Sequence, residues 1–278
     1  MKIIIVFVSS IFFMIGYGFS QSVKVDTIYS GILKKKIPTT VILPSNYDVA
    51  KQYPIFYLLH WWSADNNSFL KTNLLLEIKD KELIIVTPYA DTSWYVNSYS
   101  NPNNRYEDFM SLELFKYIDK KYNIDAKRQA IGGFSMGGYG ALLIGLKHPE
   151  RFKFVADISG LINAPSYDIP LTPQSPLNYV INSLRISFGD ENSVVPDSTN
   201  IFSLIKHITP SENTFIYMAV GKHDQFDFIV PQHKRFIQQL DRQKLKYQYL
   251  EFDGGHFDGK VLAASMPSLF KKLTETLK

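Results

Sequence analysis

Residues 129–138 read Gln-Ala-Ile-Gly-Gly-Phe-Ser-Met-Gly-Gly, and this stretch decides the fold. Its first four residues are typical of a β-strand. Residues 136–147 are typical of an α-helix that ends before a proline, which cannot continue the helical hydrogen bonds. The G-x-S-x-G pattern of residues 133–137 therefore predicts a sharp turn between a strand and a helix. Such a turn presents the Ser135 hydroxyl at the positive end of the helix, where a developing negative charge is favoured.

Two interpretations of Ser135 are open at this point. In the catalytic interpretation, Ser135 Oγ is a nucleophile and the Met136 backbone N–H is one donor of an oxyanion hole. In the structural alternative, Ser135 only caps a glycine-rich helix. Gly138 and Gly140 extend the close packing of this segment, and they favour the catalytic interpretation.

Outward from this turn, apolar β-branched runs alternate with helical patterns. This alternation is typical of an α/β fold, in which helices cover both faces of a mostly parallel sheet. We expect about eight strands in that sheet, at residues 23–32, 36–43, 54–59, 83–87, 129–133, 154–158, 214–220 and 246–252. We expect helices at residues 68–79, 106–122, 136–147, 228–240 and 260–277.

The stretch 161–209 departs from this pattern. It has no long periodic run, and it contains Pro165, Pro170, Pro173, Pro176 and Pro196. We expect an excursion over the strand ends, with short helices near residues 178–184 and 201–206. Long connections of this kind are often functional covers, and a passive surface loop is the alternative.

The composition predicts one large catalytic domain over residues 22–278. Hydrophobic residues make up 45% of the 278 residues and charged residues 20%, as in ordinary folded domains. The net charge of +4 is too small to predict nucleic-acid binding without a clustered basic patch. Because the chain has no cysteine, it has no disulfide framework and no thiolate metal site.

The first twenty residues are typical of an export signal. Lys2 supplies the positive start, residues 3–15 are almost entirely apolar, and Gly18 and Ser20 suit cleavage before Gln21. An uncleaved N-terminal anchor is the alternative, although the apolar run is short for a membrane span. We therefore expect a secreted or periplasmic protein without stable membrane association after cleavage.

A serine hydroxyl is a weak nucleophile and needs an adjacent base. In folds with this turn the chain order is serine, acid, histidine. His256 follows the last expected strand and two glycines that let the loop turn back, so we expect it to be the base. Asp224, just after the strand at 214–220, is the expected acid that orients the imidazole. Asp227 is the competitor, and its alternative role is that of a carboxylate at a helix start.

With these residues in place, the chain resembles the esterase D-like family of α/β-hydrolases over roughly residues 35–260. That family includes S-formylglutathione hydrolases, feruloyl and acetyl esterases, and mycolyltransferases. The motifs that carry the resemblance are residues 93–95 (Ser-Trp-Tyr), 105–109 (Arg-Tyr-Glu-Asp-Phe), 133–141, 148–152 (His-Pro-Glu-Arg-Phe), 221–224 (Gly-Lys-His-Asp) and 254–256 (Gly-Gly-His). The resemblance implies an α/β-hydrolase fold, ester hydrolysis without metal or cofactor, and Asp224 rather than Asp227 as the acid.

The chain departs from the family at residues 60–63, which read His-Trp-Trp-Ser. The family usually has His-Gly here, and the residue after the glycine lends the second oxyanion N–H. By position that donor is Trp62, and Trp61 stands in place of the glycine. The bulk of Trp61 either reshapes the acyl pocket or packs into a local aromatic cluster that leaves the hole intact.

Several aromatic residues are expected where the loops gather at the strand ends, since α/β sheets bind ligands there. We expect Trp61, Trp94 and Tyr95 to bind substrate, whereas His223 either lines the cleft or is a solvated loop residue. Aromatic planes stack on sugars and phenolic rings. Together with the export signal, this favours a small-molecule or polysaccharide ester substrate.

The sequence thus predicts a serine carboxylesterase that hydrolyses short-chain acyl esters or carbohydrate-linked acetyl and feruloyl esters. Four alternatives are open: acyl transfer to a sugar acceptor, a siderophore-lactone esterase, an S-formylglutathione hydrolase-like thioesterase, and a catalytically inactive carbohydrate-binding relative. The last depends only on Trp61 in the oxyanion segment.

Overall fold

A computed structural model describes residues 21–165, 178–190, 192–194, 196–209 and 214–278. The predicted export signal at residues 1–20 lies outside the described residues, as do Pro170, Pro173 and Pro176 of the excursion. The strands form one eight-stranded sheet in the order β1-β2-β4-β3-β5-β6-β7-β8. Their bounds are β1 Ser22–Ser30, β2 Lys35–Leu43, β3 Tyr53–Leu59, β4 Ile84–Pro88, β5 Ile124–Phe134, β6 Phe154–Ile158, β7 Phe215–Gly221 and β8 Tyr247–Phe252.

Most of the sheet is parallel. The pairs β1–β2 and β2–β4 are antiparallel, and every pair from β4 to β8 is parallel. The expected strands are therefore all present, and the prediction of a mostly parallel sheet is confirmed. Because parallel strands place their carboxyl ends at the same edge, the loops after β3, β5, β7 and β8 emerge together.

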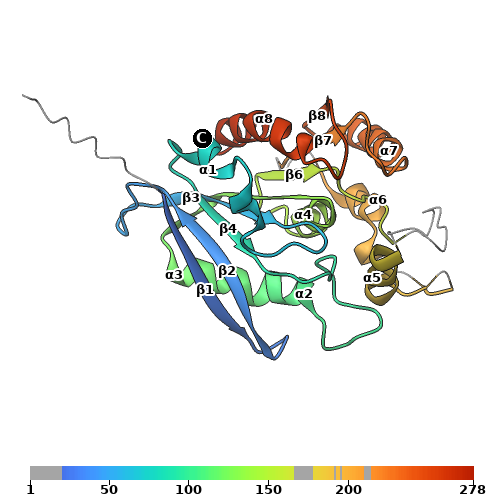
Figure 1. Ribbon diagram of the computed structural model, residues 1–278, viewed down its shortest axis with the longest axis horizontal. Helices are drawn as coiled ribbons and strands as arrows, with labels where there is room; N and C mark the ends of the chain where they lie inside the picture. The colour runs from blue at the N-terminus through green and yellow to red at the C-terminus, as the bar shows by residue number, and fades with distance from the viewer. Residues whose placement is uncertain (1–20, 166–177, 191, 195, 210–213) are drawn as a thin grey trace, which may run out of the picture.

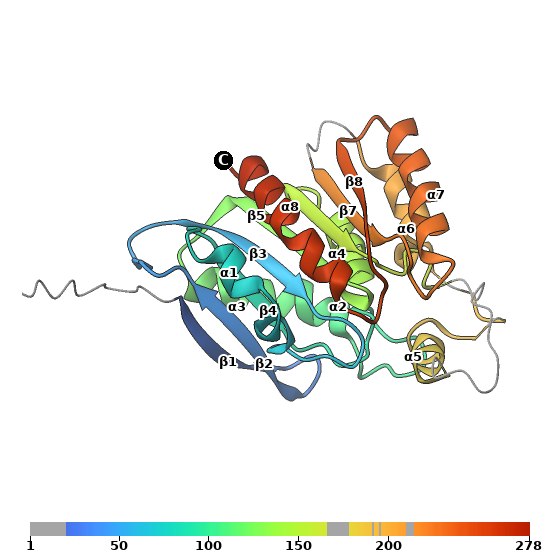
Figure 2. The same cartoon turned by 45° about the horizontal axis from the view of Figure 1, so that its top comes forward.

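Helices cover both faces of the sheet (Figures 1 and 2). Helices α1 (Leu74–Ile78) and α8 (Lys260–Thr276) pack on one face, and α3 (Phe115–Lys121), α4 (Met136–Lys147) and α7 (Ile229–Arg242) on the other. Along β3, Phe56 and Leu58 join the cluster under α8, whereas Tyr57 joins the cluster around α4. This alternation is the period of two that a strand imposes on its side chains.

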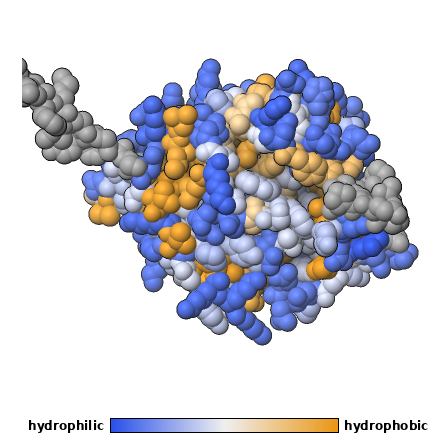
Figure 3. Space-filling model, in the orientation of Figure 1, coloured by the Kyte–Doolittle hydropathy of each residue, from blue (hydrophilic) through white to orange (hydrophobic). Residues whose placement is uncertain are grey.

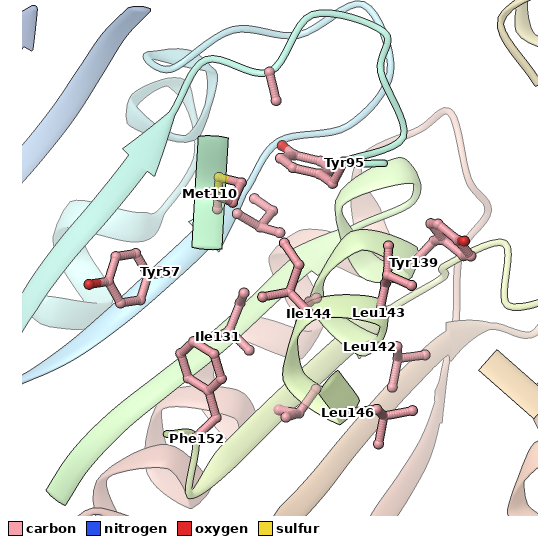
Figure 4. Close-up of a cluster of buried hydrophobic side chains, with 14 of the residues drawn as sticks. Tyr57, Tyr95, Met110, Ile131, Tyr139, Leu142, Leu143, Ile144, Leu146 and Phe152 are labelled. Carbon is pink, nitrogen blue, oxygen red and sulfur yellow. The ribbon is translucent and has the colours of Figure 1, made fainter. Parts of the chain in front are cut away.

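Helix α4, which follows the decisive turn, is buried on all sides. Every residue from 136 to 146 is buried, as expected of a helix that is apolar all round. Figure 4 shows Leu142, Leu143 and Ile144 leaving this helix in different directions, each among other core side chains. The predicted bounds of this helix, 136–147, are confirmed. Tight packing on every side fixes the start of α4, and with it the turn that carries Ser135.

Two expected helices are interrupted. The helix expected at 106–122 consists of α2 (Tyr106–Asp108), a π-helical turn (Phe109–Leu114) and α3. The π turn changes the helical phase, so that Phe109, Met110 and Leu114 are all buried. The helix expected at 68–79 is a 3₁₀ turn (Ser68–Lys71) followed by α1, because Thr72 between them is extended, with ψ −173°.

The excursion after β6 contains α5 (Asn178–Phe188) and α6 (Ile201–Leu204), near the two expected positions. The segment after β4 holds α5 in place through backbone bonds. Tyr99 N–H donates to Ser187 O at 3.0 Å, and Ser100 N–H donates to Ile186 O at 3.1 Å. Helix α5 therefore has a defined position beside the loops that follow the strands (Figure 1).

The visible surface is largely hydrophilic, with hydrophobic residues in separate patches (Figure 3). Exposed apolar side chains include Val23, Val25 and Tyr29 on the edge strand β1. Across the described part of the chain, the helices are too short or too polar to cross a membrane.

Candidate active site

Ser135 lies in the turn between β5 and α4 with a strained backbone. Its φ of 56° and ψ of −116° are rare for a residue with a side chain. The Ser135 N–H donates to Ile158 O at 2.9 Å, which ties the turn to β6. A Cβ atom on Gly133 would lie 2.3 Å from Gly137 O, so the turn closes only with glycine there. This is the tight geometry that the G-x-S-x-G pattern predicts.

His256 reaches the serine from the loop after β8. Its Nε2 atom lies 2.8 Å from Ser135 Oγ. The side-chain amide oxygen of Gln225 accepts the N–H groups of His256 at 2.6 Å and of Phe257 at 3.2 Å, which fixes the loop. The imidazole also packs against Phe226, whose ring centroid is 4.7 Å away. The ring is therefore held in place before any substrate arrives.

Asp224 completes the arrangement from the loop after β7. Its Oδ2 atom lies 3.1 Å from His256 Nδ1, and its Oδ1 atom accepts the Phe226 N–H at 2.9 Å. The Asp224 side chain is 1% exposed. Because a carboxylate only accepts, His256 Nδ1 carries the proton and the Nε2 lone pair faces the serine hydroxyl. Asp227, the competing acid, is exposed on the short segment before α7.

The two amides expected to form the oxyanion hole follow two paired strands of the sheet, β5 and β3. Met136 is the first residue of α4, and Trp62 follows β3. Neither backbone N–H has a hydrogen-bond acceptor among the residues that the structure describes. Within the described structure, both N–H groups therefore remain available as donors.

His60 fixes the peptide group that contains the Trp62 amide. Its Nδ1–H donates to Trp61 O at 2.8 Å, and its Nε2 accepts the Ala90 N–H at 2.9 Å. Burial lowers the pKa of His60 below its ordinary value, so the ring is neutral, as these two bonds require. The Trp61 carbonyl and the Trp62 N–H belong to one planar trans peptide and point in opposite directions. His60 therefore directs the Trp62 N–H away from its own ring.

The Trp61 ring packs edge-on against Phe69 at 5.3 Å and Phe134 at 5.9 Å between centroids. Packing into a local aromatic cluster was one of the two outcomes expected for Trp61 from the sequence. The bulky residue that stands in place of the family glycine is thus accommodated by neighbouring rings, while its carbonyl stays bonded to His60.

A cavity of about 870 Å³ opens at Ser135 and His256. Its aromatic lining is Trp61, Trp62, Trp94, Phe134, Phe226, Phe228 and Phe257. Val180 and Ile181 of α5 also line the cavity, so this helix forms part of its wall. On the side between α1 and α8, the lining includes Lys71, Thr72, Asn73, Asp258 and Lys260. The lining is therefore mostly aromatic and aliphatic, with polar and charged residues contributed by the segments around the starts of α1 and α8.

Two residues expected at the substrate lie outside this lining. Tyr95 is fully buried among the core side chains of Figure 4, and its hydroxyl donates to His60 O at 3.1 Å. Its ring packs where a side chain on Gly140 would otherwise lie. The His223 side chain is 74% exposed, with its Nε2 atom 3.3 Å from an exposed carboxylate of Asp253. The loop after β7 turns Asp224 inward and His223 toward solvent.

The sequence did not single out Gln225, His60 or Ser183 for the roles that the structure gives them. Gln225 follows the predicted acid directly, but nothing in its pattern indicates that it holds the His256 loop. Ser183 lies in α5, and its hydroxyl accepts hydrogen bonds from two tryptophans. Within the described residues, no group of three or more histidine or acidic side chains is placed to hold a metal ion.

The sheet order, the turn after β5 and the loops that converge on it define an α/β hydrolase. A family model described as "Putative esterase" matches residues 30–264. The chain therefore belongs to this esterase family and is a carboxylic ester hydrolase, which confirms the resemblance found in the sequence motifs.

Individual relatives carry several esterase names. The chain is 28% identical over 242 residues to an acetyl esterase of Caldicellulosiruptor saccharolyticus, which covers 82% of this chain and 89% of the relative. It is 26% identical over 152 residues to the S-formylglutathione hydrolase of Mus musculus, covering 47% of this chain and 54% of that protein. A solved ferulic acid esterase superposes with a TM-score of 0.75 at 25% identity, covering 94% of this chain and all of that one.

Proposed function

We propose that this chain is a serine carboxylesterase in which Ser135, His256 and Asp224 act as nucleophile, base and orienting acid. The observation that carries the proposal is the 2.8 Å separation of His256 Nε2 from Ser135 Oγ, with Nδ1 of the same ring 3.1 Å from Asp224. This continuous chain of contacts is the geometry that activates a serine hydroxyl.

The reaction has two matched halves. Ser135 Oγ attacks the ester carbonyl carbon as its proton passes to His256 Nε2, and the Met136 and Trp62 amides stabilise the resulting oxyanion. The carbon–oxygen bond to the alcohol then breaks, and His256 returns the proton to the leaving alcohol. Water then attacks the acyl-enzyme as its proton passes to His256 Nε2. The bond between the acyl carbon and Ser135 Oγ breaks, His256 returns the proton to Oγ, and the acid is released. Asp224 stabilises the imidazolium that forms in both halves.

For the substrate, we propose an ester whose acyl group is aromatic, such as a feruloyl group on a carbohydrate. A cavity of about 870 Å³ is within the range that encloses a drug-sized molecule, far more than an acetyl group fills. Seven aromatic side chains in its lining offer faces for a phenolic ring. The likeness to a ferulic acid esterase supports this substrate, and the likeness to an acetyl esterase supports a smaller acyl group.

Parallel assays of Ser135→Ala and the parent enzyme test the proposal. Hydrolysis of p-nitrophenyl acetate and methyl ferulate should fall by about 10⁶-fold in the variant, with unchanged folding. Full activity without the hydroxyl would refute the mechanism.

A panel of methyl ferulate, acetylated xylan and S-formylglutathione then ranks the acyl groups by kcat/KM. A clear preference for S-formylglutathione or for acetylated xylan would refute the aromatic acyl group while leaving the mechanism intact. Product analysis with an added sugar acceptor separates hydrolysis from acyl transfer.

We also propose that residues 1–20 are an export signal and that the mature enzyme is secreted or periplasmic. The support is the sequence pattern of Lys2, the apolar run and the small residues before Gln21. An extracytoplasmic location suits an enzyme that removes acyl groups from a polysaccharide.

A further inference from the structure

The hydroxyl of Ser183 joins three separate parts of the cavity wall. It accepts the indole N–H of Trp62 at 2.9 Å and that of Trp94 at 2.9 Å, and it donates to Val180 O at 2.5 Å. A serine hydroxyl has one donor and two acceptor positions, so all its hydrogen-bonding capacity is used. Ser183 is 6% exposed. Water is thus poorly placed to replace any of these bonds.

The two tryptophans and Ser183 come from distant parts of the chain. Trp62 follows β3, Trp94 follows β4, and Ser183 lies in α5, at sequence separations of 121 and 89 residues. Trp94 and the adjacent Tyr95 have φ values of 55° and 59°, a strained backbone for residues with side chains. Such strain persists only where surrounding contacts hold it, and the bond from Trp94 to Ser183 is one of those contacts.

Trp62 is held at both of its ends. His60 fixes the peptide group through the Trp61 carbonyl, and Ser183 fixes the indole. Rotation of the Trp62 side chain would disturb the same residue whose backbone N–H is the proposed donor to the oxyanion. A shift of about 1 Å in such a donor is enough to slow an enzyme substantially.

We propose that Ser183 is a positioning residue that holds Trp62 so that its backbone N–H stays aimed at the oxyanion, making α5 part of the catalytic scaffold. This proposal rests on the proposed function, since it takes the Trp62 amide as an oxyanion donor. Ser183 itself does not touch the reacting atoms. It acts by fixing the indole, and its loss should therefore appear in the chemical step more than in substrate binding.

The test compares Ser183→Ala with Ser187→Ala, using p-nitrophenyl acetate. Ser187 is a matched control, because it lies one turn further along α5, is 4% exposed, and its hydroxyl makes only a long bond to Ser93 O at 3.4 Å. Its backbone carbonyl, which accepts the Tyr99 N–H, is kept in the alanine variant. For Ser183→Ala we expect kcat to fall about tenfold and KM to change less than about twofold. Ser187→Ala should keep kcat within about twofold of the parent. Ser183→Thr, which keeps the hydroxyl, should restore much of kcat.

Trp62→Phe removes the hydrogen bond between the Trp62 indole and Ser183 by removing its donor. This variant replaces Ser183→Ala in the test if Ser183→Ala folds poorly. It should reproduce the kcat loss, and the double variant should lose no more than either single variant. The three tryptophans of the chain, Trp61, Trp62 and Trp94, all line the cavity, so fluorescence excited selectively at tryptophan reports this site. We expect a shifted emission maximum in Ser183→Ala and parent emission in Ser187→Ala.

Parent kcat in Ser183→Ala, or an equal loss in both serine variants, would overturn the positioning role. Neither result would contradict the proposed function, which is tested separately by the activity of Ser135→Ala. Conversely, activity that survives Ser135→Ala would remove the proposed function whatever Ser183 does.

Discussion

Replacing Asp224 by asparagine keeps the size of the side chain and changes only its hydrogen bonding. In the native site, Asp224 accepts twice: from the Phe226 N–H at 2.9 Å and from His256 Nδ1–H at 3.1 Å. An amide has only one acceptor atom, so it cannot serve both donors. If its oxygen stays on the Phe226 N–H, its NH₂ group faces His256 Nδ1, and the imidazole must adopt the other tautomer. His256 Nε2 then carries a proton and cannot accept one from Ser135.

The opposite orientation of the amide would leave the Phe226 N–H facing another donor, beside a residue 224 side chain that is 1% exposed in the native site. An unsatisfied buried donor costs about 1–3 kcal/mol, so the amide favours the orientation that disables the base. In serine hydrolases with this arrangement, the same substitution lowers kcat by about 10⁴-fold. That factor corresponds to about 5 kcal/mol of activation free energy.

The assay measures kcat for p-nitrophenyl acetate at neutral pH in Asp224→Asn and in Asp227→Asn, with thermal unfolding as a folding control. Asp227→Asn should keep nearly full activity, because Asp227 is exposed. A loss in Asp227→Asn together with less than a tenfold loss in Asp224→Asn would show that the acid is misassigned.

Two further results are expected from the structure and one from the sequence. Because burial lowers the pKa of His60, the unfolded chain takes up a proton on this ring at a higher pH than the folded chain does. The free energy of unfolding should therefore decline below about pH 6.5, by at most about 1.4 kcal/mol per pH unit from this group. Urea unfolding of His60→Asn at several pH values should lack this decline. Gly133→Ala places a Cβ atom 2.3 Å from Gly137 O and should lower stability by about 1–3 kcal/mol or more, whereas Gly31→Ala, with its Cβ contact at 3.4 Å, should be nearly neutral in thermal unfolding. Protein exported by a bacterial host should begin at Gln21 in intact-mass measurements, and retention of residues 1–20 in the exported form would contradict the cleavage site.

The sheet and the nucleophile turn were predictable because their signals are local. Each strand carries its own apolar run, and the turn around Ser135 needs glycines within two residues of the serine. The meeting of His256 and Asp224 with Ser135 was predictable from chain order, since the loops after parallel strands emerge at one edge, and the family resemblance favoured Asp224 over Asp227. The break at the π turn, Phe109–Leu114, was not predictable, because helical periodicity alone does not indicate where the helical phase changes.

The contacts that hold the site in place were the least predictable. The bonds of Gln225 to the His256 loop and of Ser183 to two indoles join residues far apart in sequence, and no local pattern marks them. Tyr95 is the reverse case, a residue that the sequence places at the substrate and the structure places in the core. Its neighbour Trp94 lines the cavity, but the consecutive left-handed residues turn the Tyr95 ring into the core. The position of an aromatic residue on a loop near the strand ends therefore does not by itself predict whether its side chain faces the cavity or the core.

The most direct measurement of the central claim is labelling with a fluorophosphonate, followed by mass spectrometry of the digested protein. An activated serine attacks the phosphorus, displaces fluoride and keeps the phosphonyl adduct, whereas ordinary serines do not react. We expect one adduct, on Ser135, that is abolished in Ser135→Ala and strongly slowed in His256→Ala. A folded protein that stays unlabelled, or one labelled equally well without the imidazole at 256, would contradict the account.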